Sequence, residues 1–145
     1  MRLLCLGLLA GLTAACNSKT DPLVTIPNVP VNVQLDLRDQ QNKALLFDNG
    51  VVAIPAGSAN GQGGVKGIYV VRQNATSYLA FERNCPYQPL SACATVTLDK
   101  SRLFFRDSCC ASQFDLRGLV TGGPSPRPLR SYSTSLSGSL LTITN

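Results

Sequence analysis

From residue 31 onward, the chain consists of short runs in which apolar and polar positions alternate. The first of these, VNVQLDL at 31–37, alternates strictly. Further apolar or alternating runs are found at 44–57, 68–72, 78–82, 94–98, 103–106 and 135–145. An apolar period of two in runs of this length predicts β-strands.

The strand-like runs are separated by residues that favour turns. These are Asn49-Gly50, the glycine-rich stretch 57–64, residues 73–77, residues 99–101 and Ser137-Gly138. No stretch of helical length after residue 15 has a sustained period of 3.6. The pattern therefore predicts an all-β domain of many short antiparallel strands, arranged as a sandwich or barrel.

The first fifteen residues have a different pattern. Arg2 precedes an apolar run at 3–12, and small residues then lead directly into Cys16. This order is typical of a secretory signal and is too short for a membrane-spanning helix. The cysteine after the small residues resembles a bacterial lipoprotein signal, which implies that Cys16 becomes the lipid-bearing first residue of the mature chain. We therefore expect a lipid-anchored protein of the bacterial cell envelope, on the periplasmic side or at the cell surface.

Three divisions of the chain follow from these patterns. Residues 1–15 are the expected signal peptide, and residues 16–30, which contain three prolines, are the expected flexible tether. Residues 31–145 are long enough for one domain with its own core. We expect this domain to be held to the membrane through the lipid on Cys16.

Composition excludes several kinds of function. The sequence contains no histidine, which rules out His-dependent catalytic triads and His-ligated metals. Its 13 basic and 8 acidic residues give a net charge of +5, and the basic residues are scattered singly. Scattered charge predicts a solvated surface, so we expect no nucleic-acid partner. The sequence shows no recognisable catalytic constellation and favours a non-enzymatic role.

Four cysteines remain if Cys5 leaves with the signal peptide and Cys16 carries lipid. Cys85 and Cys93 follow the run at 78–82, and Cys109 and Cys110 follow the run at 103–106. Antiparallel hairpin strands return to the same end of a sheet, so these two loops, here called the tip, should lie close together. An even number of cysteines in an exported domain favours disulfides, although converging sulfurs also suit a metal.

The motifs around these cysteines resemble those of the Rieske iron–sulfur family. They are Cys-Pro-Tyr at 85–87, a hairpin, a second cysteine loop running into 112–115, and then GGPSPRPL at 122–129 with Tyr132. The resemblance covers about residues 31–145. It implies a Rieske-like antiparallel sandwich or barrel with a two-loop cysteine tip, covered by residues 122–129, here called the proline loop.

The family holds a 2Fe–2S cluster with Cys-x-His and Cys-x-x-His loops. By this resemblance Cys85 occupies the first cysteine position and Tyr87 the first histidine position. Asp107 occupies the second cysteine position and Cys110 the second histidine position. A phenol and a carboxylate replace ligands on which Rieske chemistry depends, so we expect the cluster to be lost and no cofactor to be bound.

The four cysteines of the tip can form disulfides in three different pairings. A Cys109–Cys110 bond is disfavoured because adjacent Cα atoms lie about 3.8 Å apart, below the usual disulfide range of about 4.4 Å and above. Two cross-loop arrangements then remain. The family pattern implies Cys93–Cys109, which leaves Cys85 for Cys110.

The sequence thus predicts a membrane-anchored binding or structural module, in which two disulfides take over the structural role of the cluster. The tip and the proline loop are its expected contact surface, for an envelope protein that the sequence does not identify. One alternative is electron transfer through a 2Fe–2S cluster, or another metal, held by Cys85, Cys93, Cys109 and Cys110. Another is thiol exchange through a labile Cys85–Cys110 bond.

Overall fold

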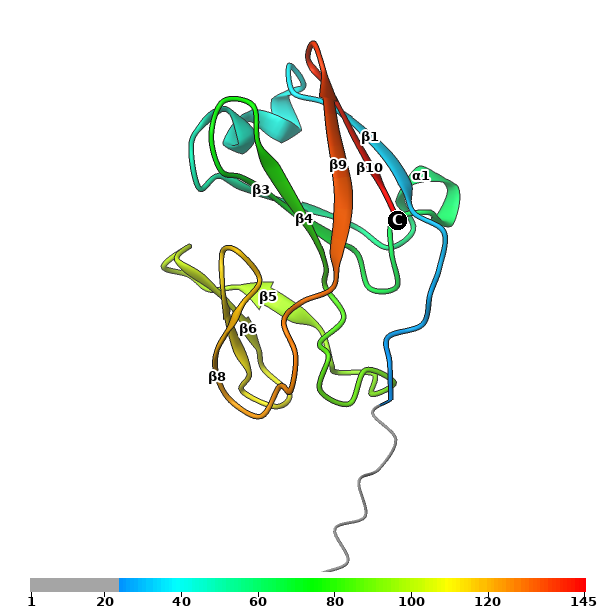
Figure 1. The fold of residues 1–145 in the computed structure, drawn as a ribbon, viewed down its shortest axis with the longest axis vertical. Helices are drawn as coiled ribbons and strands as arrows, with labels where there is room; N and C mark the ends of the chain where they lie inside the picture. The colour runs from blue at the N-terminus through cyan, green and yellow to red at the C-terminus, as the bar shows by residue number, and fades with distance from the viewer. Residues whose placement is uncertain (1–23) are drawn as a thin grey trace, which may run out of the picture.

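The computed structural model describes residues 24–145, so the expected signal peptide, Cys16 and the first part of the tether lie outside the described residues. The described part is built from antiparallel strands in two sheets (Figure 1). One sheet has the order β1-β10-β9-β4-β3-β2 and the other the order β5-β6-β7-β8. The strands are β1 (Asn32–Asp36), β2 (Val51–Ile54), β3 (Ile68–Arg72), β4 (Tyr78–Glu82), β5 (Val96–Leu98), β6 (Phe104–Asp107), β7 (Gln113–Asp115), β8 (Val120–Gly122), β9 (Ser131–Ser137) and β10 (Leu140–Thr144).

Strand β3 separates two hydrophobic cores because both of its faces are buried. Ile68 and Val70 point into the first core, which the six-stranded sheet encloses. Tyr69 and Val71 point the other way, into a second core shared with the four-stranded sheet. A strand covered on both faces has a continuous apolar run rather than an alternating one, which explains the sequence IYVV.

The second core supports the tip. Phe105 of β6 and Phe114 of β7 are both fully buried there. The Phe105 ring stacks on Tyr69 with 4.8 Å between ring centroids, and the Tyr69 hydroxyl accepts a hydrogen bond from the Leu98 N–H at 2.9 Å. These contacts join the small sheet to the large one, and Cys85 lies in the same core.

The predicted all-β fold is confirmed, with differences in detail. Strands β3 and β4 occupy the predicted residues, but β7 and β8 fall in a segment for which no strand was predicted. Before the Asn49-Gly50 turn the chain forms a 3-10 helix, η1 (Gln40–Leu46), instead of a strand. Its Leu45 is fully buried in the first core, and a Cβ at Gly50 would lie 1.7 Å from the Ala44 carbonyl oxygen. The burial of Leu45 in the first core and the close approach of Gly50 to Ala44 together favour the helix over a strand here.

The part of the expected tether that is described, residues 24–30, contains no helix or strand and lies against the domain. Ile26 is buried there. Arg127 donates a hydrogen bond to the Val24 carbonyl, and Arg130 donates to the carbonyls of Ile26 and Pro27. The remaining helix, α1 (Ser58–Gly61), is a single turn, and between residues 24 and 145 no helix is long and apolar enough to cross a membrane.

Candidate functional site

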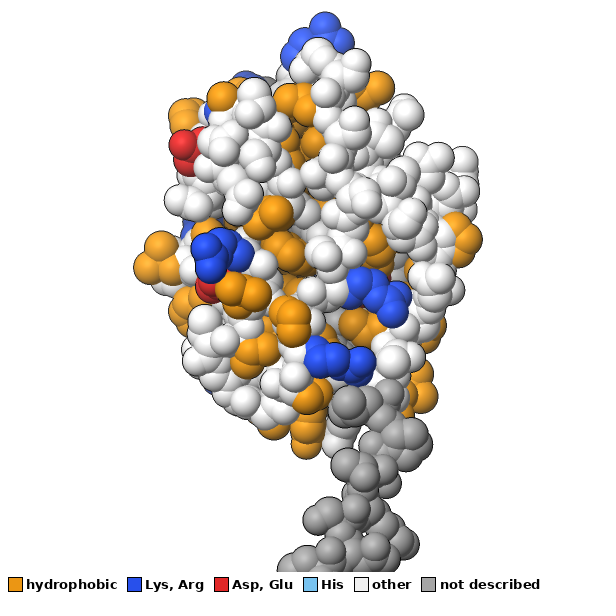
Figure 2. Space-filling model, viewed as in Figure 1, with side chains coloured by type: hydrophobic (Ala, Val, Ile, Leu, Met, Phe, Trp, Pro, Cys, Tyr) orange, Lys and Arg blue, Asp and Glu red, His pale blue; other side chains and the backbone are white. Residues whose placement is uncertain are grey.

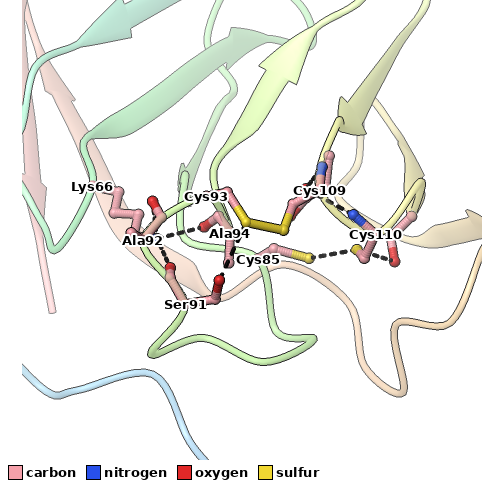
Figure 3. The surroundings of a disulfide bond; sticks show 10 residues. Lys66, Cys85, Ser91, Ala92, Cys93, Ala94, Cys109 and Cys110 are labelled. Carbon is pink, nitrogen blue, oxygen red and sulfur yellow. Dashed lines mark hydrogen bonds between the residues drawn. A yellow bond between two sulfur atoms is a disulfide. The ribbon is translucent and has the colours of Figure 1, made fainter.

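The two cysteine loops of the tip lie side by side at the end of the small sheet (Figure 3). The first loop leaves β4 and is closed by a β-bridge between Asn84 and Thr95. The second loop follows β6, and the N–H of Asp107 closes it by donating to the Ser112 carbonyl at 2.9 Å. The sequence argument that hairpin strands return their loops to one end is therefore correct.

A disulfide joins the two loops. Cys93 and Cys109 are bonded at 2.02 Å, across a sequence separation of 16 residues. Both cysteines are exposed, so the bond lies on the surface of the tip. This is the pairing that the family resemblance implied.

Lys66 holds the first loop in place from outside the tip. Its ammonium group donates to three backbone carbonyls, those of Ser91 at 2.6 Å, Ala92 at 3.2 Å and Ala94 at 3.0 Å. Figure 3 shows the lysine reaching over the segment that carries Cys93. The lysine thus fixes the backbone of the first loop around residues 91–94.

The second predicted disulfide is not formed. Cys85 and Cys110 are free thiols whose sulfur atoms face one another at 3.8 Å. Cys85 is fully buried among the apolar side chains of the second core, and the Cys110 sulfur lies 3.1 Å from the Ser112 hydroxyl. Packing on one side and the turn on the other therefore hold the sulfurs in contact but beyond the bonding distance of about 2.0 Å.

Asp107 is the third polar group at this point. It is fully buried, and its Oδ1 accepts hydrogen bonds from the N–H groups of Cys109 at 2.6 Å and Cys110 at 3.3 Å. Its Oδ2 has no hydrogen-bond partner among the described residues. One ligand atom from each of Cys85, Asp107 and Cys110 lies within 4.8 Å of the other two.

The surroundings of Cys85 favour its neutral thiol. Burial raises the pKa of the Cys85 thiol well above its ordinary value, and this outweighs the opposing effect of the Tyr87 backbone N–H. The neighbouring Asp107 carboxylate raises the pKa of Cys85 further, because it attracts the hydrogen of the neutral thiol and its charge repels a thiolate, and the Cys110 sulfur adds to this repulsion. Cys85 is therefore a poor nucleophile as it stands, because nucleophilic attack requires the thiolate.

The other predicted ligand positions do not join this group. Tyr87 is half-buried and packs against the second core. The alternative four-cysteine metal site is contradicted, because Cys93 and Cys109 are bonded to each other and so cannot act as thiolate ligands. Only Cys85 and Cys110 remain as sulfur donors among residues 24–145.

This donor set does not fit a 2Fe–2S cluster. Such a cluster takes four protein ligands, either four thiolates or two thiolates and two imidazoles, with one pair on each iron. The tip supplies two thiols and one carboxylate whose ligand atoms converge on one point rather than forming two separated pairs. The sequence contains no imidazole.

Two positioning residues were not recognised from the sequence. The Ser112 hydroxyl contacts Cys110 and accepts the Ser125 N–H at 3.0 Å, so it ties the proline loop to the second loop. A Cβ at Gly123, whose φ is +81°, would lie 2.5 Å from the Ser112 Cα, so only glycine allows this close approach. The other such residue is Lys66, and no local pattern distinguishes it from the surface lysines.

A buried carboxylate also organises the base of the first loop. Glu82 accepts hydrogen bonds from the N–H groups of Val65, Lys66 and Asn84, at 2.7, 3.0 and 3.0 Å. It also accepts the hydroxyl of Tyr132 at 2.7 Å. A charged residue at the end of the apolar strand 78–82, just before Cys85, is the signal that could have identified it.

Comparison with known proteins relates this architecture to one fold. The crystal structure of the plasma membrane Rieske protein PetC3 from the cyanobacterium Synechocystis PCC 6803 matches with a TM-score of 0.52 and 24% identity, over 81% of this chain and 100% of that one. The ferredoxin of carbazole 1,9a-dioxygenase from Nocardioides aromaticivorans IC177 matches with a TM-score of 0.45 and 20% identity, over 80% of this chain and 97% of that one. No family model matches the chain, and no curated protein matches it. The chain therefore has a Rieske-like fold.

Proposed function

We propose that this chain is a Rieske-like domain that has lost the 2Fe–2S cluster and acts as a binding or structural module of the cell envelope, anchored by lipid on Cys16. The observation that carries the proposal is the changed donor set on a retained fold. Asp107 and Tyr87 stand where the resemblance places a cysteine and a histidine ligand. The fold itself matches a Rieske protein over most of its length.

The contacts within the tip support a structural role that needs no cluster. The Cys93–Cys109 bond joins the two loops, and Lys66 fixes the first of them. Ser112 attaches the proline loop to the second. Three loops are thereby held in one arrangement, which is what a preformed binding surface requires.

The expected contact surface lies beside these loops. A groove of about 390 Å³ is lined by Pro86 of the first loop, by residues 127–131, and by Thr25 and Ile26 of the N-terminal segment. Leu90, also in the first loop, is 72% exposed. Figure 2 shows basic and apolar side chains together on this face, near the point where the described chain begins. A mixed surface of this kind suits a polar partner with a small apolar contact.

Anchoring through Cys16 would place the tip near the membrane. Eight residue steps separate Cys16 from Val24, which can span at most about 29 Å. Val24 and the next residues are bound by Arg127 and Arg130, which lie beside the tip. We therefore propose that the partner is an envelope protein at or close to the same membrane.

The loss of the cluster is tested by spectroscopy on the full chain, purified in detergent without reductant. We expect a colourless protein that contains less than stoichiometric iron. A brown protein with stoichiometric iron and sulfide would contradict the proposal.

The anchor and the contact surface need separate tests. Cys16→Ala should move the protein from the membrane fraction to the soluble fraction, and unchanged fractionation would refute lipid anchoring. For the contact surface, benzoylphenylalanine replaces Leu90, and for the control it replaces Phe47, which is 71% exposed but lies after η1, outside the tip. A crosslinked partner in cells is expected at Leu90 only, and equal crosslinking from both positions would refute a specific surface at the tip.

A further inference from the structure

We propose that Cys85, Asp107 and Cys110 bind a single Zn²⁺ ion, which joins the two loops of the tip at the place where a second disulfide was predicted. The inference concerns the same tip as the proposed function but does not depend on the lipid anchor or on an envelope partner. It differs from an iron–sulfur site in nuclearity, in ligands and in metal.

The separation of the two sulfurs is the first observation. Zinc thiolate bonds are about 2.3 Å long, and two such bonds at a tetrahedral angle place their sulfurs about 3.8 Å apart. The Cys85 and Cys110 sulfurs lie 3.8 Å apart, from two different loops (Figure 3). Two thiols in simple contact can have the same separation, so the distance alone does not identify a metal site.

The Asp107 carboxylate favours a metal site over simple contact between two thiols. Its buried Oδ2 has no hydrogen-bond partner among the described residues, and a carboxylate oxygen of Asp107 lies within 4.8 Å of both sulfurs. An unpaired buried carboxylate oxygen costs free energy, which a cation in contact with it would offset. The other oxygen is held by the N–H groups of Cys109 and Cys110, so the carboxylate is oriented as a metal ligand requires.

The chemistry of the donors selects the metal. On binding, the Cys85 and Cys110 thiols release their two protons to solvent, because the metal charge favours the thiolates. The resulting two thiolates and one carboxylate match the sulfur and oxygen ligands that Zn²⁺ takes, whereas Mg²⁺ and Ca²⁺ take oxygen ligands alone. Three protein ligands leave a fourth tetrahedral position open.

The experiment uses the full chain in detergent with the Cys93–Cys109 bond intact. Bound metal is measured by mass spectrometry, and Co²⁺ and Cd²⁺ are then titrated into chelator-treated protein. We expect about one zinc per chain as isolated. We also expect visible Co²⁺ bands of tetrahedral form and a thiolate-to-Cd²⁺ charge-transfer band, each saturating at one ion.

Two variants and a control assign the site. Cys110→Ser removes a ligand, and Asp107→Asn retains the Oδ1 acceptor while replacing the carboxylate. Each should weaken Co²⁺ binding by about 100-fold or more, since even residues that only support a ligand contribute 10–100-fold. Asp48→Asn, at an exposed carboxylate far along the chain from the tip, should bind as the unchanged protein does. Circular dichroism shows that each variant is folded.

Several results would overturn the inference. These are protein with two titratable thiols and no saturable Co²⁺ or Cd²⁺ band, zinc retained stoichiometrically by Cys110→Ser, and a Cys85–Cys110 disulfide in metal-free protein as isolated. None of them bears on the proposed loss of the iron–sulfur cluster, because that proposal fails on stoichiometric iron and this one fails when Cys85 and Cys110 do not bind a single metal ion.

Discussion

Lys66→Met tests whether the first loop of the tip is held by one side chain. Methionine retains a long apolar side chain but removes the ammonium group that donates to the Ser91, Ala92 and Ala94 carbonyls. Hydrogen bonds from a charged donor contribute about 1.5–3 kcal/mol each. The bond to Ala92 is exposed and can be replaced by water, so two partly buried bonds remain. Two such bonds contribute about 3–6 kcal/mol together. Because both are only partly buried, we expect the free energy of unfolding to fall by the lower end of this range, about 3 kcal/mol.

The loss should be local as well as global. The Ala94 carbonyl also accepts the N–H of Cys85 at 3.1 Å, and the Ala94 N–H donates to Ser91 at 3.2 Å. Without Lys66 these two amides should exchange with solvent faster than in the unchanged protein by more than the loss of global stability explains. The amides of β3 should exchange faster only by the amount that the loss of global stability explains. Hydrogen exchange measured by mass spectrometry after peptide digestion separates the two effects.

A matched control is Lys100→Met, which changes an exposed lysine in the turn between β5 and β6. It should alter the free energy of unfolding by less than about 0.5 kcal/mol, as most surface substitutions do. Urea unfolding of both variants gives the comparison. If Lys66→Met also falls within this limit, and the amides of residues 85 and 94 exchange as before, the assigned role of Lys66 is wrong.

Three further predictions address the disulfide, the buried hydroxyl and the second core. Replacing Cys93 and Cys109 together by alanine should lower the free energy of unfolding by about 3 kcal/mol in the chain-entropy estimate for a 16-residue loop, and a loss below about 1 kcal/mol in urea unfolding would contradict it. Burial and the hydrogen bond to Glu82 raise the pKa of Tyr132, so the neutral hydroxyl stabilises the fold fully below about pH 10 and this contribution is lost at higher pH. Tyr132→Phe should therefore reduce the fall in the free energy of unfolding above about pH 10, measured by urea unfolding at a series of pH values, and an unchanged fall would refute this. Phe105→Ala should cost about 3–5 kcal/mol and Phe105→Leu less, because the larger cavity forms where the two sheets meet, and equal losses on calorimetry would argue against this packing.

The strands could be predicted where local pattern and tertiary environment agree. The runs at 68–72 and 78–82 form β3 and β4 with the predicted bounds. Turn residues flank both runs, and their apolar side chains pack into a hydrophobic core on each face of the sheet. Strands β7 and β8 were not predicted because each is only three residues long, which is too short for an alternating pattern to distinguish a strand from a loop. The 3-10 helix at 40–46 depends on Leu45 filling the first core, which the local sequence does not state.

The candidate site divides in the same way. The tip, its four cysteines and the Cys93–Cys109 bond followed from the order of strands and from the resemblance in the loops. Which groups lie against the Cys85 and Cys110 sulfurs could not be predicted in this way. The resemblance placed Asp107 at a replaced ligand position, but the hydrogen bonds to one of its oxygens and the lack of a partner for the other depend on a turn and on complete burial.

The sequence by itself determined the fold class, the absence of imidazole ligands and the meeting of two cysteine loops at one end of a sheet, because these depend on composition, period and strand order. Only the tertiary structure decided that Cys85 and Cys110 remain thiols beside a buried carboxylate while Lys66 and Ser112 fix the surrounding loops. The physical reason is distance. A disulfide, a shared metal ion and a hydrogen bond require distances between the interacting atoms that differ by only one or two ångströms. For groups far apart in sequence, these distances are set by tertiary packing.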